Sequence, residues 1–455
     1  MPIQSLNTGY SALTAAQIGL DTTSNNIANA NTEGFTRQRV EQGQLRARDI
    51  QVGQVGQGTS IKDITRARDA FLDERVRSAS AQTSAFETNA ELLSRAESLL
   101  AEPDYGVTSA LDDLWSGFED LALDPSDQGR RTAVKNQLDV ITTRLNSIST
   151  GMDDLVTDSS SRVGTSLISI NDTIAKIAQL NEAVGRSAAT GTTPNDLLDS
   201  RDLLIDSLVN DIGATVTYTN NGHVRVSLNG LSLVDGITAR QLDWNSTTQE
   251  LTHENGLTLR VGGTIGGLQK FILDDAPQIL SQLDDLTTDL VAALNTKHAA
   301  GFSDSGVAGT NLLDFNPTDP AGTVFVALAS TADFALAAVD GTPFPIHNGD
   351  NALSLSQLRN DLTAAGATSS LLDAARGLVS EVGSRTSAAL AQATAQADLR
   401  LAAELSRSSA HGVNLDEEMI ELIRYQRAYE AAARIITAAD QALDTLINRT
   451  GIVGR

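Results

Sequence analysis

The chain of 455 residues contains no cysteine. Disulfide bonds and metal sites built from thiolates are therefore excluded, and the folded state must be held by packing and polar contacts. The sequence also lacks any apolar run long enough to cross a bilayer, and its nearest approach is the short stretch 324–329. We predict a multidomain protein without membrane-spanning segments, since this length allows two to four domains.

Basic side chains are scarce. The chain has 33 lysines and arginines against 57 acidic residues, which gives a formal net charge of -24. Residues 1–50 carry four side chains of each sign, and residues 412–455 carry seven acidic and five basic ones, so most of the excess lies in the middle. An acidic body argues against nucleic acid as a partner, because phosphates are bound by basic stripes. It argues equally against an anionic membrane surface.

The first twenty residues contain no charged side chain. They therefore lack the basic n-region of a secretory signal, and no compact apolar core with a small-residue cleavage site follows. We expect the protein to have no cleaved general-secretory signal peptide.

Both ends of the chain carry apolar side chains at alternating steps of three and four residues, which is the spacing of a coiled-coil seam. The amino-terminal seam positions are Ile3, Leu6, Tyr10, Leu13, Gln17, Leu20, Ser24 and Ile27. The carboxy-terminal positions are Met419, Leu422, Gln426, Tyr429, Ala433, Ile436, Asp440, Leu443 and Ile447. The pattern predicts two helices that each present one stripe to a partner.

Two such helices would be only marginally stable by themselves. Docking on the rest of the same chain is the commoner arrangement, but Gln17, Gln426 and Asp440 interrupt the stripes, and a buried core rarely accepts such side chains. We therefore predict that the large apolar seam residues pack against other subunits. It follows that residues 1–45 and 412–455 should be mobile in the free monomer.

The interior of the chain shows helical periodicity, interrupted once. Helices are predicted at 69–101, 107–121, 134–155, 167–184, 197–212, 279–294 and 355–407. Between residues 213 and 270 the pattern becomes strand-like around Asn221-Gly222, Asn229-Gly230 and Asn255-Gly256, which favour hairpin turns. The glycine-rich run 262–267 is expected to be a turn beside this β module, and residues 36–66 are expected to be extended or irregular.

These elements predict a mainly α, elongated multidomain chain with paired terminal coiled-coil helices, a long-helix bundle and a small inserted β domain. Because helices both precede and follow the β module in the sequence, the chain is expected to run outward to this module and then return beside its first half. The predicted domains are residues 1–45 with 412–455 (terminal helices), 46–212 with 271–411 (bundle) and 213–270 (β domain).

No group of residues points to catalysis, a metal or a cofactor. The five histidines lack the spacing at which two would share a helix face as metal ligands. Adjacent carboxylates such as Asp284 and Asp285 point about 100° apart on a helix, so they rarely act on one proton. We predict a protein that is not an enzyme. A hydrolase using serine and histidine near His347, or an adhesin that presents the β domain, is the alternative.

Two terminal motifs resemble the signatures of the bacterial flagellar axial proteins, the family of rod, hook, junction and filament subunits. The first runs from residue 24 to 38, and its family residues are Asn25, Asn26, Asn29, Asn31, Gly34, Phe35 and Arg37. The second begins at residue 412, contains Asn414 and Leu415, and continues in Tyr425-Gln426-Arg427-Ala428-Tyr429. The ending Thr36-Arg37-Gln38 and the interior stretch 195–202 favour the hook–filament junction subunits, with hook or rod subunits as the alternative.

The resemblance implies a structural, non-enzymatic subunit in a thin helical layer that joins hook to filament, with terminal helices that line the inner tube. It implies extracellular location at the hook–filament junction, type III export, and a part in flagellum assembly and motility. The implied partners are further copies of the chain, the hook protein, a second junction protein (hook-associated protein 3), and an export chaperone at the carboxy-terminal segment. Residues 301–370 carry little of the resemblance.

Overall fold

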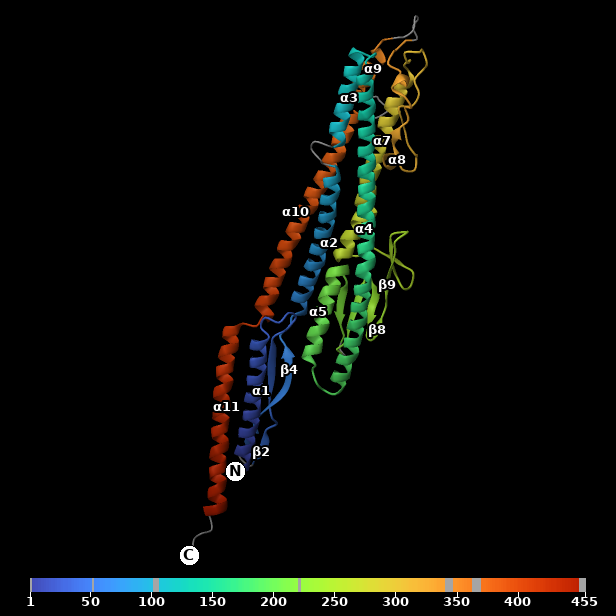
Figure 1. Cartoon of the computed structure of the whole chain (residues 1–455). Helices are drawn as coiled ribbons and strands as arrows, with labels where there is room; N and C mark the ends of the chain where they lie inside the picture. Colours follow the sequence, from blue (N-terminus) through green and yellow to red (C-terminus); the bar gives the residue numbers. More distant parts are fainter. Residues whose placement is uncertain are drawn as a thin grey trace. The chain divides into compact units, whose positions relative to one another are not determined.

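The computed structural model describes residues 2–50, 53–100, 106–219, 222–339, 347–361 and 370–449 (Figure 1). Long helices dominate it and small antiparallel sheets accompany them, which confirms the predicted fold class. The chain divides into two compact units. Unit 1 comprises Met1–Gln82, Ser169–Leu242 and Ala397–Arg455, and unit 2 comprises Thr83–Ile168 and Asp243–Gln396.

Three helices contribute residues to both units. They are α2 (Ala70–Leu100), α4 (Gln128–Ala189) and α10 (Leu371–His411). The region expected as one β domain, residues 213–270, is likewise divided, because its four-stranded sheet belongs to unit 1 and most of its three-stranded sheet to unit 2. Both helical segments predicted at 134–155 and 167–184 are parts of the single helix α4.

In unit 1, the predicted terminal helices are confirmed as α1 (Pro2–Ala28) and α11 (Leu415–Asp444), which lie side by side (Figure 1). A short π-helical turn, Thr445–Arg449, follows α11. The side chain of Asn414 accepts a hydrogen bond from the N–H of Asp416 at 3.0 Å and so caps the start of α11. Three acidic residues in the first turn of α11 add favourable charge at its amino end.

The stretch predicted to be extended or irregular forms an antiparallel ribbon beside α1. Strand β1 (Gln38–Gln44) pairs with β4 (Thr59–Arg66), and the register shifts between Glu41 and Gln42. The shorter strands β2 (Arg48–Ile50) and β3 (Gly53–Val55) pair beyond them. Both long strands contact α1, where the N–H of Thr59 donates to Oγ of Ser11 at 3.4 Å.

The rest of unit 1 contains α5 (Asn195–Ile212) and a sheet in the order β5-β6-β7-β8. Its strands are β5 (Thr215–Tyr218), β6 (Val224–Leu228), β7 (Leu231–Asp235) and β8 (Thr238–Ala239). Gly213 ends α5 with a left-handed backbone, φ 67°. Asn229 (φ 50°) and Gly230 (φ 83°) form the predicted tight turn between β6 and β7. Asn221 lies outside the described residues.

Unit 2 is a helical bundle whose interior is mainly apolar. Besides its parts of α2, α4 and α10, it contains α3 (Val107–Leu123), α6 (Gly263–Lys270), the π-helical turn η1 (Phe271–Asp275), α7 (Ala276–Ala299) and α9 (Asp350–Ser356). The periodic residues Leu111, Leu114, Leu138 and Leu145 are completely buried, as their spacing predicts. Shorter elements fill the loop-rich part: β12 (Leu313–Asp314), α8 (Pro320–Thr323), β13 (Phe325–Val326), η2 (Thr331–Asp333) and η3 (Gln357–Asn360).

The glycine-rich run 262–267 is not a turn, and this prediction was wrong. It is the beginning of α6, which follows the small sheet of β9 (Leu242–Asn245), β10 (Glu250–His253) and β11 (Thr258–Leu259). A Cβ at Gly267 would lie 2.4 Å from the carbonyl oxygen of Ala85 on α2. The glycine therefore serves close helix packing. The predicted hairpin around Asn255-Gly256 is confirmed by the pairing of β10 with β11.

His298, near the end of α7, is fully buried. Its Nδ1 lies 2.6 Å from the carbonyl oxygen of Thr310, and its Nε2 accepts a hydrogen bond from the N–H of Ala335 at 2.9 Å. The two contacts fix a neutral ring with its proton on Nδ1. Burial lowers the pKa of His298, although the hydrogen bond to Thr310 opposes that effect.

This geometry predicts a loss of stability in mild acid. The folded chain binds the His298 proton less readily than the unfolded chain, so the contribution to stability is complete above about pH 6.5 and is lost as the pH falls below it. We expect the denaturant midpoint of unit 2 to fall between pH 7 and pH 5. His298→Gln should weaken this pH dependence, and His347→Gln, at an exposed position, should not. Equal pH profiles in wild type and His298→Gln would contradict the assignment.

Candidate assembly surface

Helix α1 approaches α11 through small residues. Gly9 faces the side chains of Ile435 and Ile436, and Gly19 faces the ring of Tyr425. A Cβ at position 19 would lie 2.4 Å from Cε1 of Tyr425, so the approach requires glycine there. Along the whole of α11 the buried residues are Glu418, Ala432 and Ala439. The contact between the two helices is therefore close but narrow.

A buried polar cluster joins the two terminal motifs. Nδ2 of Asn26 donates to Oε2 of Glu418 at 2.9 Å, and Nε of Arg37 donates to Oε1 of Glu418 at 2.6 Å. Arg37 also donates to Glu417 at 2.9 Å. Asn26 and Glu418 are each only 2 % exposed, and a buried carboxylate requires such partners. We call Asn26, Arg37 and Glu418 the terminal lock.

The terminal lock also fixes the first strand. Asn26 donates to the carbonyl oxygen of Gln38 and accepts from its N–H, both at 2.9 Å. The end of α1, the start of β1 and the first turn of α11 are thereby held at one point. Sequence reasoning singled out Asn26 and Arg37. Glu418 lay within the predicted carboxy-terminal motif but was not singled out, because its partners lie near the other end of the chain.

The other signature residues shape the chain between α1 and β1. Nδ2 of Asn29 donates to the carbonyl oxygen of Asn25 at 3.0 Å and to its Oδ1 at 2.8 Å. Gly34 adopts a left-handed backbone with φ 78°, which favours glycine. Phe35 is half-buried, whereas Asn31 and the carboxy-terminal Leu415 are exposed.

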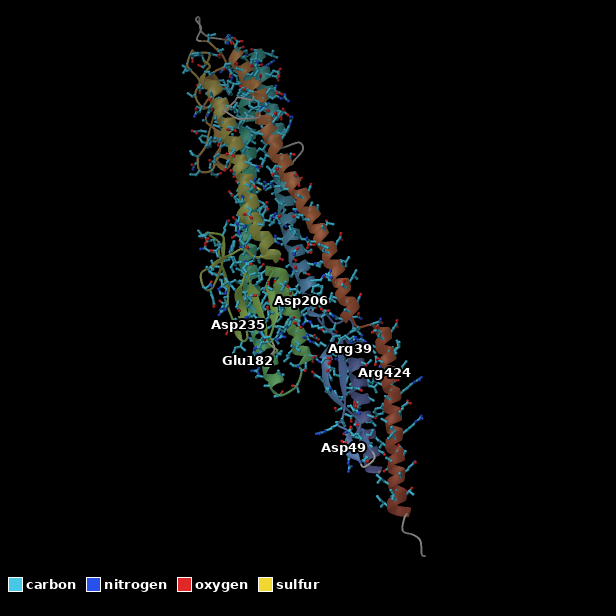
Figure 2. The ribbon with its side chains drawn as sticks, turned by 180° about the vertical axis from the view of Figure 1, so that it is seen from behind. Arg39, Asp49, Glu182, Asp206, Asp235 and Arg424 are labelled. Carbon is cyan, nitrogen blue, oxygen red and sulfur yellow. The ribbon has the colours of Figure 1, made fainter. Side chains whose placement is uncertain are left out.

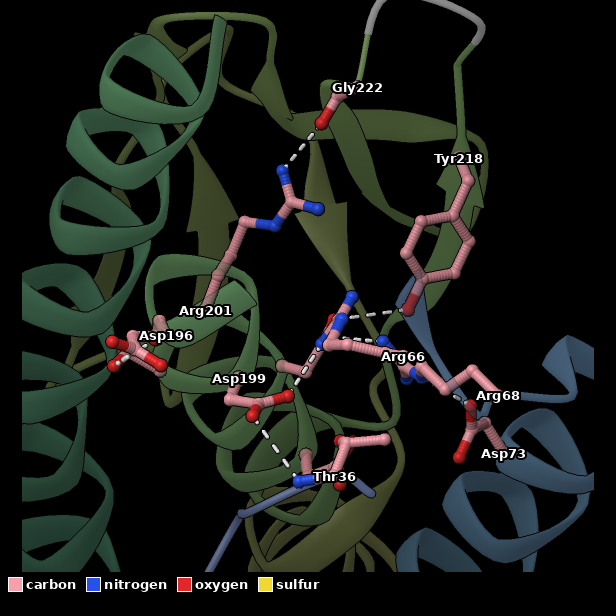
Figure 3. Close-up of polar contacts among 12 residues, drawn as sticks. Thr36, Arg66, Arg68, Asp73, Asp196, Asp199, Arg201, Tyr218 and Gly222 are labelled. Atoms are coloured by element: carbon pink, nitrogen blue, oxygen red, sulfur yellow. Dashed lines mark hydrogen bonds and ion pairs between the residues drawn. The ribbon is translucent and has the colours of Figure 1, made fainter. Parts of the chain in front are cut away.

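A second polar cluster connects the ribbon to α5, within the interior motif at 195–202 (Figure 3). Arg66 donates to Asp199 at 2.8 Å and to Asp202 at 2.7 Å. Arg68 pairs with Asp202 and, at 2.7 Å, with Asp73. Burial lowers the pKa of Arg68, but the nearby carboxylates outweigh it and raise that pKa overall. The interior motif thus contributes the carboxylates that hold the end of the ribbon.

The predicted subunit-packing residues with described side chains are not buried within the chain. The half-buried members are Leu6, Leu13, Leu20, Ile27, Leu422, Ile436 and Leu443. The exposed members are Tyr10 (67 %), Met419 (54 %), Tyr429 (38 %) and Ile447 (74 %). Ile3 belongs to α1, but its side chain lies outside the described part. The seam positions Gln17, Ser24, Gln426 and Asp440 are exposed too.

The two faces of α1 therefore differ. Its small residues turn to α11 and the ribbon, while its large apolar residues with described side chains are half-buried or, at Tyr10, exposed. The sequence argument counted large side chains and passed over glycine and alanine, so it did not find the face that joins the two helices. Packing of the seam against other subunits stays a prediction, and the exposed fractions above support it.

The described part of the chain shows neither a candidate metal site nor a candidate membrane-spanning helix. It holds no group of three histidine or acidic side chains that could bind a metal ion. None of the described helices is long and apolar enough to cross a membrane. What the surface presents is a set of half-buried and exposed apolar side chains on a helix pair that the terminal lock joins.

Three family models match the chain. "Flagella basal body rod protein" matches residues 6–36, "Flagellar hook-associated protein FlgK helical domain" matches residues 93–313, and "Flagellar basal body rod FlgEFG protein C-terminal" matches residues 407–449. The two terminal matches contain Asn26 and Glu418 of the terminal lock, and Arg37 directly follows the first match. The large central match contains the interior motif whose carboxylates hold the ribbon.

Curated relatives match nearly the whole chain. Flagellar hook-associated protein 1 of Bacillus subtilis (strain 168) is 29 % identical, over 99 % of this chain and 99 % of the relative. The protein of the same name from Escherichia coli (strain K12) is 26 % identical, over 97 % of this chain and 99 % of the relative. The solved flagellar hook junction protein FlgK from Burkholderia pseudomallei shares the fold, with a TM-score of 0.66 and 16 % identity, over 74 % of this chain and all of that chain.

Gly19→Ala tests the close approach of the terminal helices. The added methyl group must push Tyr425 away, which we expect to destabilise the helix pair by about 1–3 kcal/mol. Circular dichroism should show helix loss from the terminal pair at lower temperature. Gly377→Ala is the matched control, because a Cβ there meets nothing within 4 Å. The same substitution in a Tyr425→Ala variant is the second control. If Gly19→Ala destabilises the wild-type chain no more than it destabilises this variant, the helices do not meet as described.

Proposed function

Because the chain belongs to the family of flagellar hook-associated protein 1, we infer that it is a structural subunit of the bacterial flagellum at the junction between hook and filament. The observation that carries this function is the terminal helix pair, which is locked together while its large apolar side chains stay accessible. The full-length relatives share the name hook-associated protein 1, so hook and rod subunits are not favoured.

Assembly follows from where these side chains lie. Burying one large apolar side chain contributes about 1.5–3 kcal/mol, so a dozen seam residues give a strong drive toward neighbouring subunits. Contact between unlike surfaces of identical subunits continues without closing and generates a helical array. The terminal lock would keep α1 and α11 in one orientation, so that every copy offers the same surface.

The wider assignment is part of the same proposal. The partners are further copies of the chain, the hook protein, hook-associated protein 3 as the second junction protein, and an export chaperone that covers the carboxy-terminal segment. Exposed apolar residues on α11 support the chaperone, since such a surface would otherwise aggregate in the cytoplasm. The protein would act outside the cell, at the flagellum, and have no enzymatic activity, nucleic-acid partner or membrane-inserted part.

A deletion strain separates this function from the alternatives. Electron microscopy should show hooks without filaments when the chain is absent. Intact filaments in that strain would favour an enzyme or an adhesin, and would contradict the junction role.

Leu443→Asp tests the seam itself. Leu443 is half-buried on α11, and a carboxylate there becomes costly once a neighbour covers it. We expect a folded monomer with normal circular dichroism, incorporation into flagella reduced below detection, and loss of motility. Gln441→Asp adds the same charge at an exposed position of α11 and should assemble normally. Normal motility of the Leu443→Asp strain would count against the seam.

A further inference from the structure

Charge is divided unequally between the two units. Unit 2 contains 32 acidic and 12 basic side chains, a net charge of -20, which leaves only -4 of the total of -24 for unit 1. Within unit 1, residues 37–68 contain seven basic and three acidic side chains, a net charge of +4. This segment includes the ribbon, so a basic element belongs to a strongly acidic chain.

Three of these cations have acidic partners among the described residues. Arg37, Arg66 and Arg68 form the buried ion pairs of the two polar clusters. The other four are exposed on the ribbon: Arg39, Arg46, Arg48 and Lys62. None of these four forms an ion pair with any residue that the structure describes. We call them the basic hairpin. Figure 2 labels Arg39 on this ribbon.

Two exposed cations on α4 in unit 1 do pair with carboxylates. Lys176 pairs with Asp172 at 2.6 Å, and Arg186 pairs with Glu182 at 2.8 Å, both one turn away on α4. On the ribbon, Asp49 accepts from Gln54 and Asp63 accepts from Thr193, so these carboxylates are occupied by neutral donors. Among the residues that the structure describes, the basic hairpin therefore has no carboxylate that pairs with its positive charge.

We propose that the basic hairpin binds the acidic unit 2 of a second copy of this chain in the assembled layer. The inference rests on the proposed function and adds the surface that one subunit offers to the next. Units of net charge -20 repel one another when subunits are brought together, and a positive element between them relieves this repulsion. Unlike surfaces on identical copies also provide the head-to-tail contact that a helical layer requires.

The position of the hairpin fits this contact. The ribbon packs on α1 and is fixed at its base by the terminal lock and by Asp199 and Asp202. Its charges are thus held beside the accessible apolar side chains of the terminal helices. A nucleic acid or an anionic membrane is a weaker candidate, because the whole chain carries -24 and would be repelled.

Zero-length carbodiimide cross-linking of isolated flagella identifies the partner directly, since it joins an amine to a carboxylate in contact. Lys62 provides one amine, and Arg46→Lys with Arg48→Lys adds two more without changing the charge. We expect a product of twice the chain mass whose linked peptides join the hairpin to a carboxylate of unit 2. Products of single-chain mass, or links to a different protein, would overturn the proposal.

Charge reversal supplies the functional test. Arg46→Glu with Arg48→Glu should leave a folded monomer but reduce its incorporation into flagella by about tenfold or more, because attraction becomes repulsion. Lys176→Glu with Arg186→Glu changes the net charge equally and should assemble as wild type does. Normal assembly of the hairpin variant, beside failure of Leu443→Asp, would reject this contact and leave the proposed function standing. If the hairpin variant and the control variant on α4 both fail to assemble, only the net charge of the chain matters. That result would also reject the proposed contact.

Discussion

The close contact between α1 and α11 is the constraint on which the rest of the molecule depends. Gly19 lets the ring of Tyr425 approach the backbone of α1, and Glu418 places a buried charge between Asn26 and Arg37. Small residues occupy the contact, so the larger apolar side chains of α1 have no room in it and turn elsewhere. A single chain therefore completes the orientation of its terminal helices but does not complete their burial.

The polar clusters explain how three distant motifs act as one site. The terminal lock joins residues 392 positions apart in the sequence, Asn26 and Glu418. Asp199 and Asp202 then hold Arg66 at the far end of β4. Such buried ion pairs contribute little net stability compared with apolar packing. Any arrangement that separates the partners leaves a buried charge uncompensated, so the ion pairs favour one arrangement of the motifs. The result is a defined surface for assembly.

Sequence periodicity predicted those elements whose burial is complete. Leu111, Leu138 and Leu145 repeat at helical spacing because each is enclosed on its own helix face, and Asn229-Gly230 marked its hairpin because few other residues adopt positive φ. The same reasoning failed where small residues decide the packing. Gly267 lies within a helix that touches Ala85, and Gly9 and Gly19 define the α1 contact, yet a glycine carries no hydrophobic signal. Contacts such as Glu418 with Arg37 could not be predicted, since nothing local to either residue indicates its partner.

The central claim is that the large apolar residues of α1 and α11, which a single chain leaves half-buried or exposed, become fully buried only against neighbouring subunits. Hydrogen–deuterium exchange of purified monomer and of isolated hook–filament junctions, compared peptide by peptide, measures this directly. The account predicts that amides of α1 and α11 exchange faster than those of α3 in the monomer, that the same amides exchange more slowly in the junction, and that α3 exchanges slowly in both states. Amides of α11 that exchange as slowly as those of α3 in the monomer would contradict it.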